Sequence, residues 1–277
     1  MPARLMDGKA LAERIRAEVA EEVKELGEVG LTTILVGDDP ASDIYIRRKQ
    51  EAAKQVGILA RDYRLAEDTT EEELLELIAQ LNADDDVDGI LVQLPLPAQI
   101  DEQRAIEAVD PAKDVDGFHP VNAGRLSLGL GGLVAGTPTG ILTLLDEYDV
   151  PLEGAHAVVV GRSNIVGKPV ALLLLARNAT VTICHSRTAD LAAETGRADV
   201  LVVAVGQAGL ITPEMVKRGA TVVDVGMNRT EEGLRGDVDP AVAEVAGLMT
   251  PVPGGVGPMT IASLLRNTVE AARARRC

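Results

Sequence analysis

The chain has 277 residues, which is enough for two α/β domains or one large domain. With three Tyr, one Phe, no Trp and a formal net charge of −16, it has few side chains that could stack on bases, so we expect no nucleic-acid partner. No run approaches the roughly 18 apolar residues of a membrane span, the N-terminus lacks a signal-peptide core, and two Cys and three His show no metal-ligand spacing. We therefore expect a cytoplasmic protein without a membrane segment or a metal site.

Short apolar runs alternate with helical patterns through most of the chain. The runs are rich in β-branched residues, which is typical of parallel strands covered on both faces. They predict strands over Leu31–Val36, Ala60–Leu65, Gly89–Gln93, Ala157–Val160, Thr180–Cys184, Val200–Val205 and Thr221–Val225. The helical patterns predict helices over Lys9–Leu26, Pro40–Val56, Thr70–Asn82 and Pro169–Arg177. Thr70 and Glu73 form a capping-box sequence. Repeated strand–helix units predict parallel sheets with right-handed crossovers.

The alternation stops between about Pro111 and Pro138, where no clear period is found. A long irregular segment in a compact α/β protein is usually a functional loop or a connection between domains. We therefore place one domain over residues 1–118 and a second over residues 139–257, and expect residues 260–277 to return as a helix that completes the first. The predicted fold is α/β with two domains, an N-terminal α/β domain and a Rossmann-type parallel-sheet domain, flanking a cleft.

Lys49 is the first candidate for chemistry. The face of its predicted helix that is expected to pack inward carries, at three- and four-residue spacing, Tyr45, Lys49, Ala52 and Val56. Partial burial lowers the pKa of a lysine towards neutrality, where it can act as general acid and base. The same spacing fits a lysine that only extends from the edge of an Ala-rich stripe, and spacing alone does not separate the two.

Two further candidates are Gln93 and Asp116. Gln93 ends a predicted strand and precedes Leu94-Pro95-Leu96-Pro97, and open α/β sheets bind ligands just beyond the carboxyl ends of their strands. Asp116 lies in Lys113-Asp-Val-Asp-Gly-Phe118, where a single Asp is more often a turn residue than a ligand. Each of these residues means little on its own.

The second domain is predicted to begin with a nucleotide-binding turn. The strand Ala157–Val160 leads through Gly161-Arg-Ser-Asn-Ile-Val-Gly167 into a helix that starts near Pro169. A dinucleotide-binding turn usually reads Gly-x-Gly-x-x-Gly, because the backbone turns tightly and approaches the pyrophosphate. Here Ser163 replaces the second glycine, and the last glycine comes one residue late. The position between strand and helix favours a variant of this site.

The residues after the next predicted strand indicate the cofactor. NAD sites carry an Asp or Glu about 20 residues beyond the turn, and it binds the ribose 2′-hydroxyl. This chain has His185-Ser186-Arg187 there, and Ser186, Arg187 and Arg162 suit a 2′-phosphate. The sequence thus predicts NADP, while an ordinary turn with solvated arginines stays open as the alternative.

Five blocks of sequence, taken in order, resemble a known family. They are Val36-Gly-Asp-Asp-Pro-Ala-Ser42 with Tyr45 and Lys49, Asp88-Gly-Ile-Leu-Val-Gln-Leu-Pro-Leu-Pro97, Lys113-Asp-Val-Asp-Gly-Phe118, Gly161-Arg-Ser-Asn-Ile-Val-Gly167 and Pro251-Val-Pro-Gly-Gly-Val-Gly-Pro-Met-Thr260. Together they are similar to the bifunctional methylenetetrahydrofolate dehydrogenase/methenyltetrahydrofolate cyclohydrolase family, from near the N-terminus to the last helix. The Gln-Leu-Pro-Leu-Pro and Pro-Gly-Gly-Val-Gly-Pro blocks are specific to that family.

The resemblance implies an enzyme that oxidises 5,10-methylenetetrahydrofolate with NADP and then hydrolyses the methenyl product to 10-formyltetrahydrofolate. It implies Lys49 as the central acid–base group, oriented by Gln93. Tyr45 then packs against the folate, and Asp116 binds the pterin. The positions implied to bind tetrahydrofolate derivatives are Tyr45, Gln93, Leu94, Pro95, Asp116 and Pro258. The positions implied to bind NADP are Gly161, Arg162, Ser163, Ser186, Arg187 and Met227.

Two positions depart from the pattern that relatives commonly show. Met227 stands where Ile is common, a conservative change in an apolar contact. Gly136 stands in Ala135-Gly-Thr-Pro138 where many relatives read Pro-Cys-Thr-Pro. Because the thiol has no step in the implied chemistry, we expect activity to survive without it.

The resemblance also implies a homodimer, since relatives pair through the nucleotide domain. Two alternative functions stay open, a family member with only one of the two activities and a nucleotide- or folate-binding protein without turnover. Retention of Tyr45, Lys49, Gln93 and Asp116 argues against the second.

Overall fold

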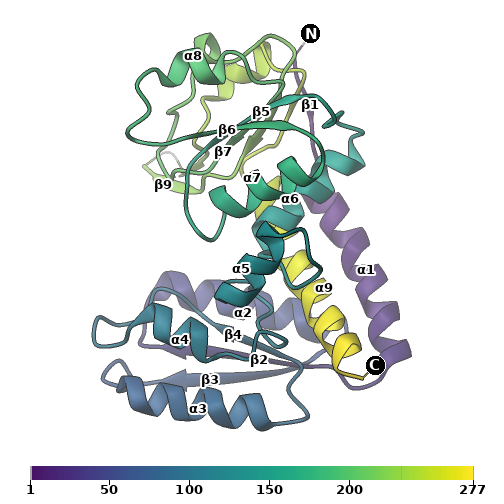
Figure 1. Ribbon diagram of the computed structural model, residues 1–277, viewed down its shortest axis with the longest axis vertical. Helices are drawn as coiled ribbons and strands as arrows, with labels where there is room; N and C mark the ends of the chain where they lie inside the picture. The colour runs from purple at the N-terminus through teal and green to yellow at the C-terminus, as the bar shows by residue number, and fades with distance from the viewer. Residues whose placement is uncertain (1, 232, 277) are drawn as a thin grey trace. The chain divides into compact units, whose positions relative to one another are not determined.

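The computed structural model describes residues 2–231 and 233–276, with the backbone alone at position 41, and the chain divides into two compact units (Figure 1). Unit 1 comprises Met1–Glu13 and Thr137–Thr260, and unit 2 comprises Arg14–Gly136 and Ile261–Cys277. The long helices α1 (Gly8–Leu26) and α9 (Val256–Arg276) contribute residues to both units.

Unit 2 differs from the expected first domain at its N-terminal end. The first strand, β1 (Arg4–Leu5), pairs in parallel with β11 (Leu248–Met249) and so belongs to the sheet of unit 1. The strand is too short to give a period in the sequence, so its partner could not be predicted.

Unit 2 is built on a three-stranded parallel sheet in the order β3-β2-β4. Its strands are β2 (Gly30–Val36), β3 (Leu59–Leu65) and β4 (Gly89–Val92). On one face α3 (Glu71–Ala83) and α4 (Glu102–Ala108) lie side by side (Figure 1). The core on this face joins Leu74, Ile78 and Leu81 of α3 to Ile34, Val36, Ile90 and Val92 of the strands. The opposite face of β2 receives α2 (Pro40–Gln55).

Polar side chains fix where the helices of unit 2 begin. The carboxylate of Asp39 accepts from the N–H of Ser42 ahead of α2, and Pro40 takes the first helical position, where its missing N–H costs nothing. The capping box predicted at Thr70 and Glu73 is confirmed at the start of α3.

The segment between about Pro111 and Pro138 is less irregular than the sequence suggested. It contains α5 (Pro120–Ser127) and the start of α6 (Gly136–Glu147). The Nδ1 atom of His119 accepts from the N–H of Val121 and caps α5, and a helix this short, with Gly124 inside it, gives no apolar period.

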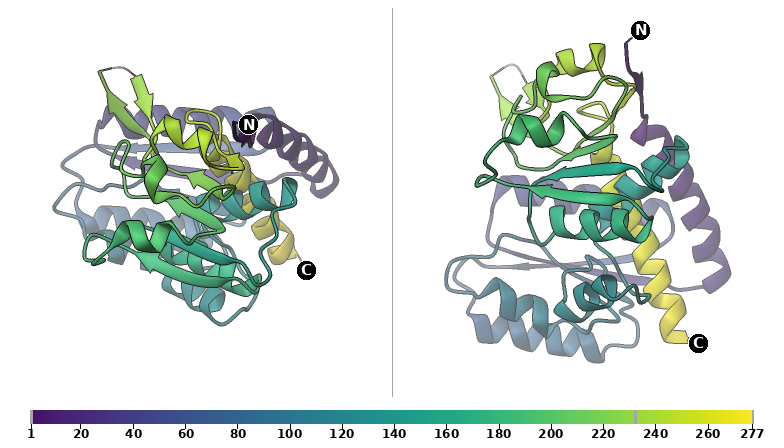
Figure 2. Two further views of the ribbon diagram at one scale, coloured as in Figure 1. Left: turned by 90° about the horizontal axis from the view of Figure 1, so that it is seen from above. Right: turned by 45° about the horizontal axis from the view of Figure 1, so that its top comes forward.

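Unit 1 is built on a parallel sheet in the order β1-β11-β8-β7-β5-β6, a Rossmann-type arrangement. Its remaining strands are β5 (His156–Val160), β6 (Thr180–Cys184), β7 (Val200–Val203) and β8 (Thr221–Asp224). The helices α6 and α7 (Gly167–Ala176) lie on one side of the sheet and α8 (Leu191–Thr195) on the other (Figures 1 and 2). The α8 side is filled by small aliphatic residues, among them Val158, Leu201, Val222 and Val242.

Short elements complete unit 1. Figure 2 shows β9 (Asn228–Thr230) and β10 (Gly233–Arg235) as an antiparallel pair separate from the main sheet. Two 3₁₀ turns follow β7 and β10, at Pro213–Met215 and Pro240–Glu244.

All strands predicted from the sequence are present, with ends shifted by a residue or two. Within residues 2–231 and 233–276, no helix has the length and apolar character needed to cross a membrane.

Candidate active site

Lys49 and Gln93 form a hydrogen-bonded pair in unit 2. Lys49 lies on α2, and Gln93 follows β4. Lys49 Nζ donates to Gln93 Oε1 at 3.3 Å, and Gln93 Nε2 donates to the carbonyl of Leu94 at 2.7 Å. The backbone N–H of Gln93 donates to the carbonyl of Ile34 at 2.9 Å, which continues the sheet for one more residue. Both ends of the amide are therefore held, with its oxygen toward the ammonium.

The buried face of α2 differs from the prediction. The C-terminal part of the predicted stripe is buried, but Tyr45 is 41% exposed and Lys49 is half-buried. Gln50, which the spacing placed elsewhere, is buried and donates to Thr33 Oγ1 at 2.6 Å. Gln50 takes the inward position on this face. Lys49 therefore lies at the edge of the buried stripe, where its ammonium is accessible to a ligand.

The loop that carries Asp116 is anchored from two directions. The N–H of Ile90 in β4 donates to the carbonyl of Lys113 at 2.7 Å. Asn267 of α9 donates through Nδ2 to the carbonyl of Val115 at 2.8 Å. The two contacts fix the backbone on the N-terminal side of Asp116.

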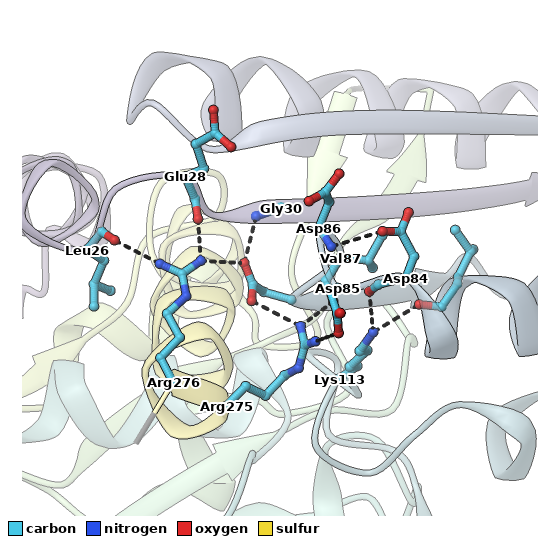
Figure 3. Close-up of polar contacts among 12 residues, drawn as sticks. Leu26, Glu28, Gly30, Asp84, Asp85, Asp86, Val87, Lys113, Arg275 and Arg276 are labelled. Carbon is cyan, nitrogen blue, oxygen red and sulfur yellow. Dashed lines mark hydrogen bonds and ion pairs between the residues drawn. The ribbon is translucent and has the colours of Figure 1, made fainter.

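The Lys113 side chain is a third anchor of this loop. It is only 1% exposed, and its ammonium donates to the carbonyls of Leu81, Asn82 and Asp84 at 3.0, 2.8 and 2.8 Å (Figure 3). These carbonyls end α3, where the helix dipole is negative, and they use all three N–H groups of the ammonium. Burial, and then the charge of Arg275, lower the pKa of Lys113.

Asp116 lies close enough to Lys49 for their charges to interact. Burial raises the pKa of the Asp116 carboxyl, the Lys49 ammonium lowers it, and Asp114 raises it again. Unit 2 thus brings together Lys49, Gln93 and Asp116 from three separate parts of the chain, with Tyr45 one helical turn before Lys49.

The other candidates for folate binding fall in different units. Leu94 and Pro95 directly follow Gln93 in unit 2 and are joined by a cis peptide bond. Pro258 lies in the first turn of α9 and belongs to unit 1, together with the nucleotide-loop residues.

The turn after β5 allows no side chain at either of its end glycines. Gly161 has φ of +126°, and a Cβ there would lie 2.3 Å from the carbonyl oxygen of Ala204. A Cβ on Gly167 would lie 2.3 Å from the carbonyl oxygen of Gly161. The turn is therefore closed as tightly as a phosphate-binding turn requires, despite its unusual spacing.

Ser163 explains why the second glycine of the usual pattern can be absent. Its Oγ accepts from the N–H of Val166 at 3.1 Å and of Gly167 at 3.3 Å, at the start of α7. The hydroxyl thus occupies two of the unpaired N–H groups that open a helix. The sequence identified Ser163 as a replacement but gave no sign of this contact.

The remaining candidates for cofactor binding are exposed polar or apolar side chains of unit 1. Arg162, Ser186 and Arg187 follow the neighbouring strands β5 and β6 and are all exposed. The Nδ1 atom of His185 accepts from the N–H of Arg187 at 3.1 Å and shapes the turn. Met227 is 42% exposed beyond the end of β8.

Sequence reasoning missed two buried carboxylates at the same edge of the sheet. Asp224 ends β8 and Asp237 follows β10, and both are almost fully buried. An Asp at a strand end or after a turn is common, so no sequence signal singled them out. Among the described residues, no group of three or more His, Cys, Asp or Glu side chains is placed to hold a metal ion.

The fold and these two groups of residues define an α/β protein of the nucleotide-binding class with a second, smaller sheet. A family model described as "Tetrahydrofolate dehydrogenase/cyclohydrolase, catalytic domain" matches residues 6–116, and one described as "Tetrahydrofolate dehydrogenase/cyclohydrolase, NAD(P)-binding domain" matches residues 135–276. The chain belongs to the tetrahydrofolate dehydrogenase/cyclohydrolase family.

Relatives of this family match the chain over its full length. The bifunctional protein FolD of Oleidesulfovibrio alaskensis is 56% identical over 283 residues, which cover 99% of both chains. The crystal structure of bifunctional FolD from Campylobacter jejuni matches with a TM-score of 0.97 and 50% identity over 99% of each chain. The Trypanosoma brucei enzyme, complexed with NADP cofactor and inhibitor, matches with a TM-score of 0.94 and 38% identity over 100% of each chain.

Proposed function

We propose that this protein is a bifunctional one-carbon folate enzyme. It oxidises 5,10-methylenetetrahydrofolate with NADP to the 5,10-methenyl compound and hydrolyses that product to 10-formyltetrahydrofolate. The full-length likeness to bifunctional relatives supports both activities. The structural observation that carries the proposal is the approach of Lys49 to Gln93 and Asp116 within unit 2.

Asp116 suits the pterin ring. The 2-amino group and N3 of a pterin are adjacent N–H donors, and one carboxylate accepts both. The loop contacts at Lys113 and Val115 fix the backbone that leads to this carboxylate. We assign Tyr45 to stack against the folate, because its exposed ring lies one turn from Lys49. Leu94, Pro95 and Pro258 are assigned as further substrate contacts.

Lys49 is assigned as the acid–base group of the hydrolysis. Water attacks the cationic methenyl carbon, and the ammonium and its conjugate amine move protons to and from the adduct as the ring opens. Gln93 is a positioning residue, since its oxygen accepts from Lys49 Nζ and directs it. No metal is needed, because the methenyl carbon is already activated by its positive charge.

The residues of unit 1 fit NADP. The closed turn at Gly161 and Gly167 lets backbone approach a pyrophosphate, and the exposed Arg162, Ser186 and Arg187 suit a 2′-phosphate. Ser163 and Met227 are assigned to the same site. NADP bound here would supply the hydride acceptor for the methylene carbon, and the protein would have only to align the two.

The deciding experiment measures three initial rates on one preparation. These are reduction of NADP and of NAD with methylenetetrahydrofolate, and hydrolysis of methenyltetrahydrofolate. We expect faster reduction of NADP than of NAD, together with hydrolysis. Loss of one activity would identify a monofunctional member of the family, and loss of both would identify a binding protein.

We also propose a role for each domain, an oligomeric state and a cellular location. Apart from β1, which pairs in the sheet of unit 1, residues 1–118 with 260–277 would form the folate-binding catalytic domain, and residues 139–257 the NADP-binding domain. A homodimer is expected, so light scattering should give about twice the chain mass of 29.1 kDa. We propose a cytoplasmic location, which fractionation of the source cells would test.

A further inference from the structure

One buried carboxylate joins three chain segments at the carboxyl edge of the six-stranded sheet. Asp237 is fully buried. Its Oδ2 accepts from the N–H groups of Val205 at 2.7 Å and Gly206 at 2.9 Å. Its Oδ1 accepts from the N–H of Gln207 at 2.8 Å and from Nδ2 of Asn228 at 2.9 Å. Two donors on each oxygen fill the accepting positions of the carboxylate.

The backbone of Asp237 is itself held by the last residue of β8. Asp224 accepts through Oδ1 from the N–H of Asp237 at 2.9 Å and through Oδ2 from the N–H of Val238 at 3.0 Å. A Cβ on Gly226 would lie 2.3 Å from Asp237 Oδ1, so the backbone at Gly226 packs directly against the carboxylate and leaves no room for a side chain. Asp237 therefore cannot move without moving β8 or the segments that it binds.

The segments that Asp237 holds lie where a nucleotide cofactor is expected. β5 pairs with β6 on one side and with β7 on the other, so the direction of strand progression reverses between β5 and β7. Ligands of such sheets bind at this reversal. Ala204 after β7 abuts Gly161 after β5, and residues 205–207 continue directly from it. Asn228 adjoins Met227, the exposed apolar residue assigned above to the cofactor.

We propose that Asp237 is a positioning residue for the cofactor. Its carboxylate fixes residues 205–207 and the Met227–Asn228 segment in the geometry that binds NADP. The inference rests on the proposed function, since it takes NADP as the cofactor of this chain. It adds a residue that does not itself touch the cofactor but holds two segments that do.

The test is Asp237→Asn in the full-length protein. A carboxamide turns N–H groups toward some of the four donors, so part of the network loses its acceptor. We expect the KM for NADP to rise by about tenfold or more. Methenyl hydrolysis, which needs no NADP, should stay within about twofold of the wild-type rate. A purely structural role would instead lower both activities in parallel.

Asp199→Asn is the matched control. Asp199 also accepts from a backbone N–H, that of His156 at 2.9 Å, and pairs with Lys217 at 2.5 Å, but it precedes β7 at the opposite edge of the same sheet. Its loss should leave the KM for NADP within about twofold. An equal rise in both variants would overturn the inference, because the effect would then be a general weakening of unit 1.

Asn228→Ala decides the question if Asp237→Asn does not fold. It removes one of the four donors and leaves the carboxylate in place, so we expect a rise of about threefold or more in the KM for NADP with hydrolysis retained. A wild-type KM in Asn228→Ala or Asp237→Asn overturns the inference. Failure of the wild-type protein itself to reduce NADP would overturn the proposed function instead, so the two failures are distinguishable.

Discussion

The Nζ of Lys49 lies 3.3 Å from Oε1 of Gln93, and the amide nitrogen of Gln93 is tied to the carbonyl of the next residue. The amide cannot rotate freely, so its oxygen keeps facing the ammonium. The lysine side chain at the edge of α2 thereby acquires a defined direction toward Gln93. This contact links the two elements that supply the candidate chemistry, α2 and the end of β4.

Lys49→Met should lower the rate of methenyl hydrolysis by about 100-fold or more, because methionine occupies similar space but has no proton that it could donate or accept in catalysis. The measurement is kcat for hydrolysis at saturating substrate. Lys54→Met, at an exposed position of the same helix, should stay within about twofold. Hydrolysis at the wild-type rate in Lys49→Met would remove the role assigned to this lysine.

Gly161→Ala should separate the two activities. The added methyl group would lie 2.3 Å from the Ala204 oxygen, and overpacking costs about 1–3 kcal/mol, so we expect the KM for NADP to rise by about tenfold. Hydrolysis should be retained. Gly154→Ala is the control, since Gly154 also has positive φ, +74°, but has nothing within 4 Å of an added Cβ. Equal effects of both substitutions would show that backbone strain, rather than the blocked turn, is responsible.

The sequence predicted those parts of the fold that have long periods or strong local signals. Buried strands such as β5 and β7 are continuous aliphatic runs, and the Thr70–Glu73 cap has a local sequence pattern. β1 and α5 were missed because their few residues give no period. The inward face of α2 was misjudged at Gln50, because its burial depends on partners in β2 and β3 that helical spacing cannot reveal.

The candidate site was predicted only as separate residues. Gln93 and Asp116 gained meaning from the family resemblance, and their approach to Lys49 follows from sheet topology and loop anchors. Asp237 was not predicted at all. Its importance comes from four donors in two separate segments, and such convergence of distant groups leaves no mark on the local sequence.

Lys113→Met should destabilise unit 2. The substitution leaves three carbonyls at the end of α3 without a donor, although it also removes a buried charge, and we expect a net loss of about 2–4 kcal/mol in the free energy of unfolding. Urea denaturation measures the loss. Lys24→Met is the control, because Lys24 makes an exposed pair with Glu21 that should contribute less than about 1 kcal/mol. If the Lys113 variant were as stable as this control, the three hydrogen bonds of the ammonium would do no more than offset the free-energy cost of burying its charge.

Asp116→Asn should increase the free energy of unfolding relative to wild type, by an amount that depends on pH, and should weaken folate binding. Burial raises the pKa of this carboxyl in the folded protein above its ordinary value of 3.8, so the folded state holds the proton more tightly than the unfolded state. Its contribution to the free energy of unfolding therefore falls as the pH rises above 3.8, and the asparagine variant escapes that fall. Relative to wild type, the variant should gain stability as the pH rises above about 4, measured by urea denaturation.

The same variant should bind folate poorly. An asparagine turns an N–H toward the pterin donors, so the KM for methylenetetrahydrofolate should rise by about tenfold or more. Asp68→Asn, at an exposed position of the same unit, should change neither quantity. If Asp116→Asn instead lost stability relative to wild type as the pH was raised, the charged carboxylate would be favoured by its surroundings. Asp116 would then stabilise the fold, and its position could not be explained as one that favours substrate binding at the expense of stability.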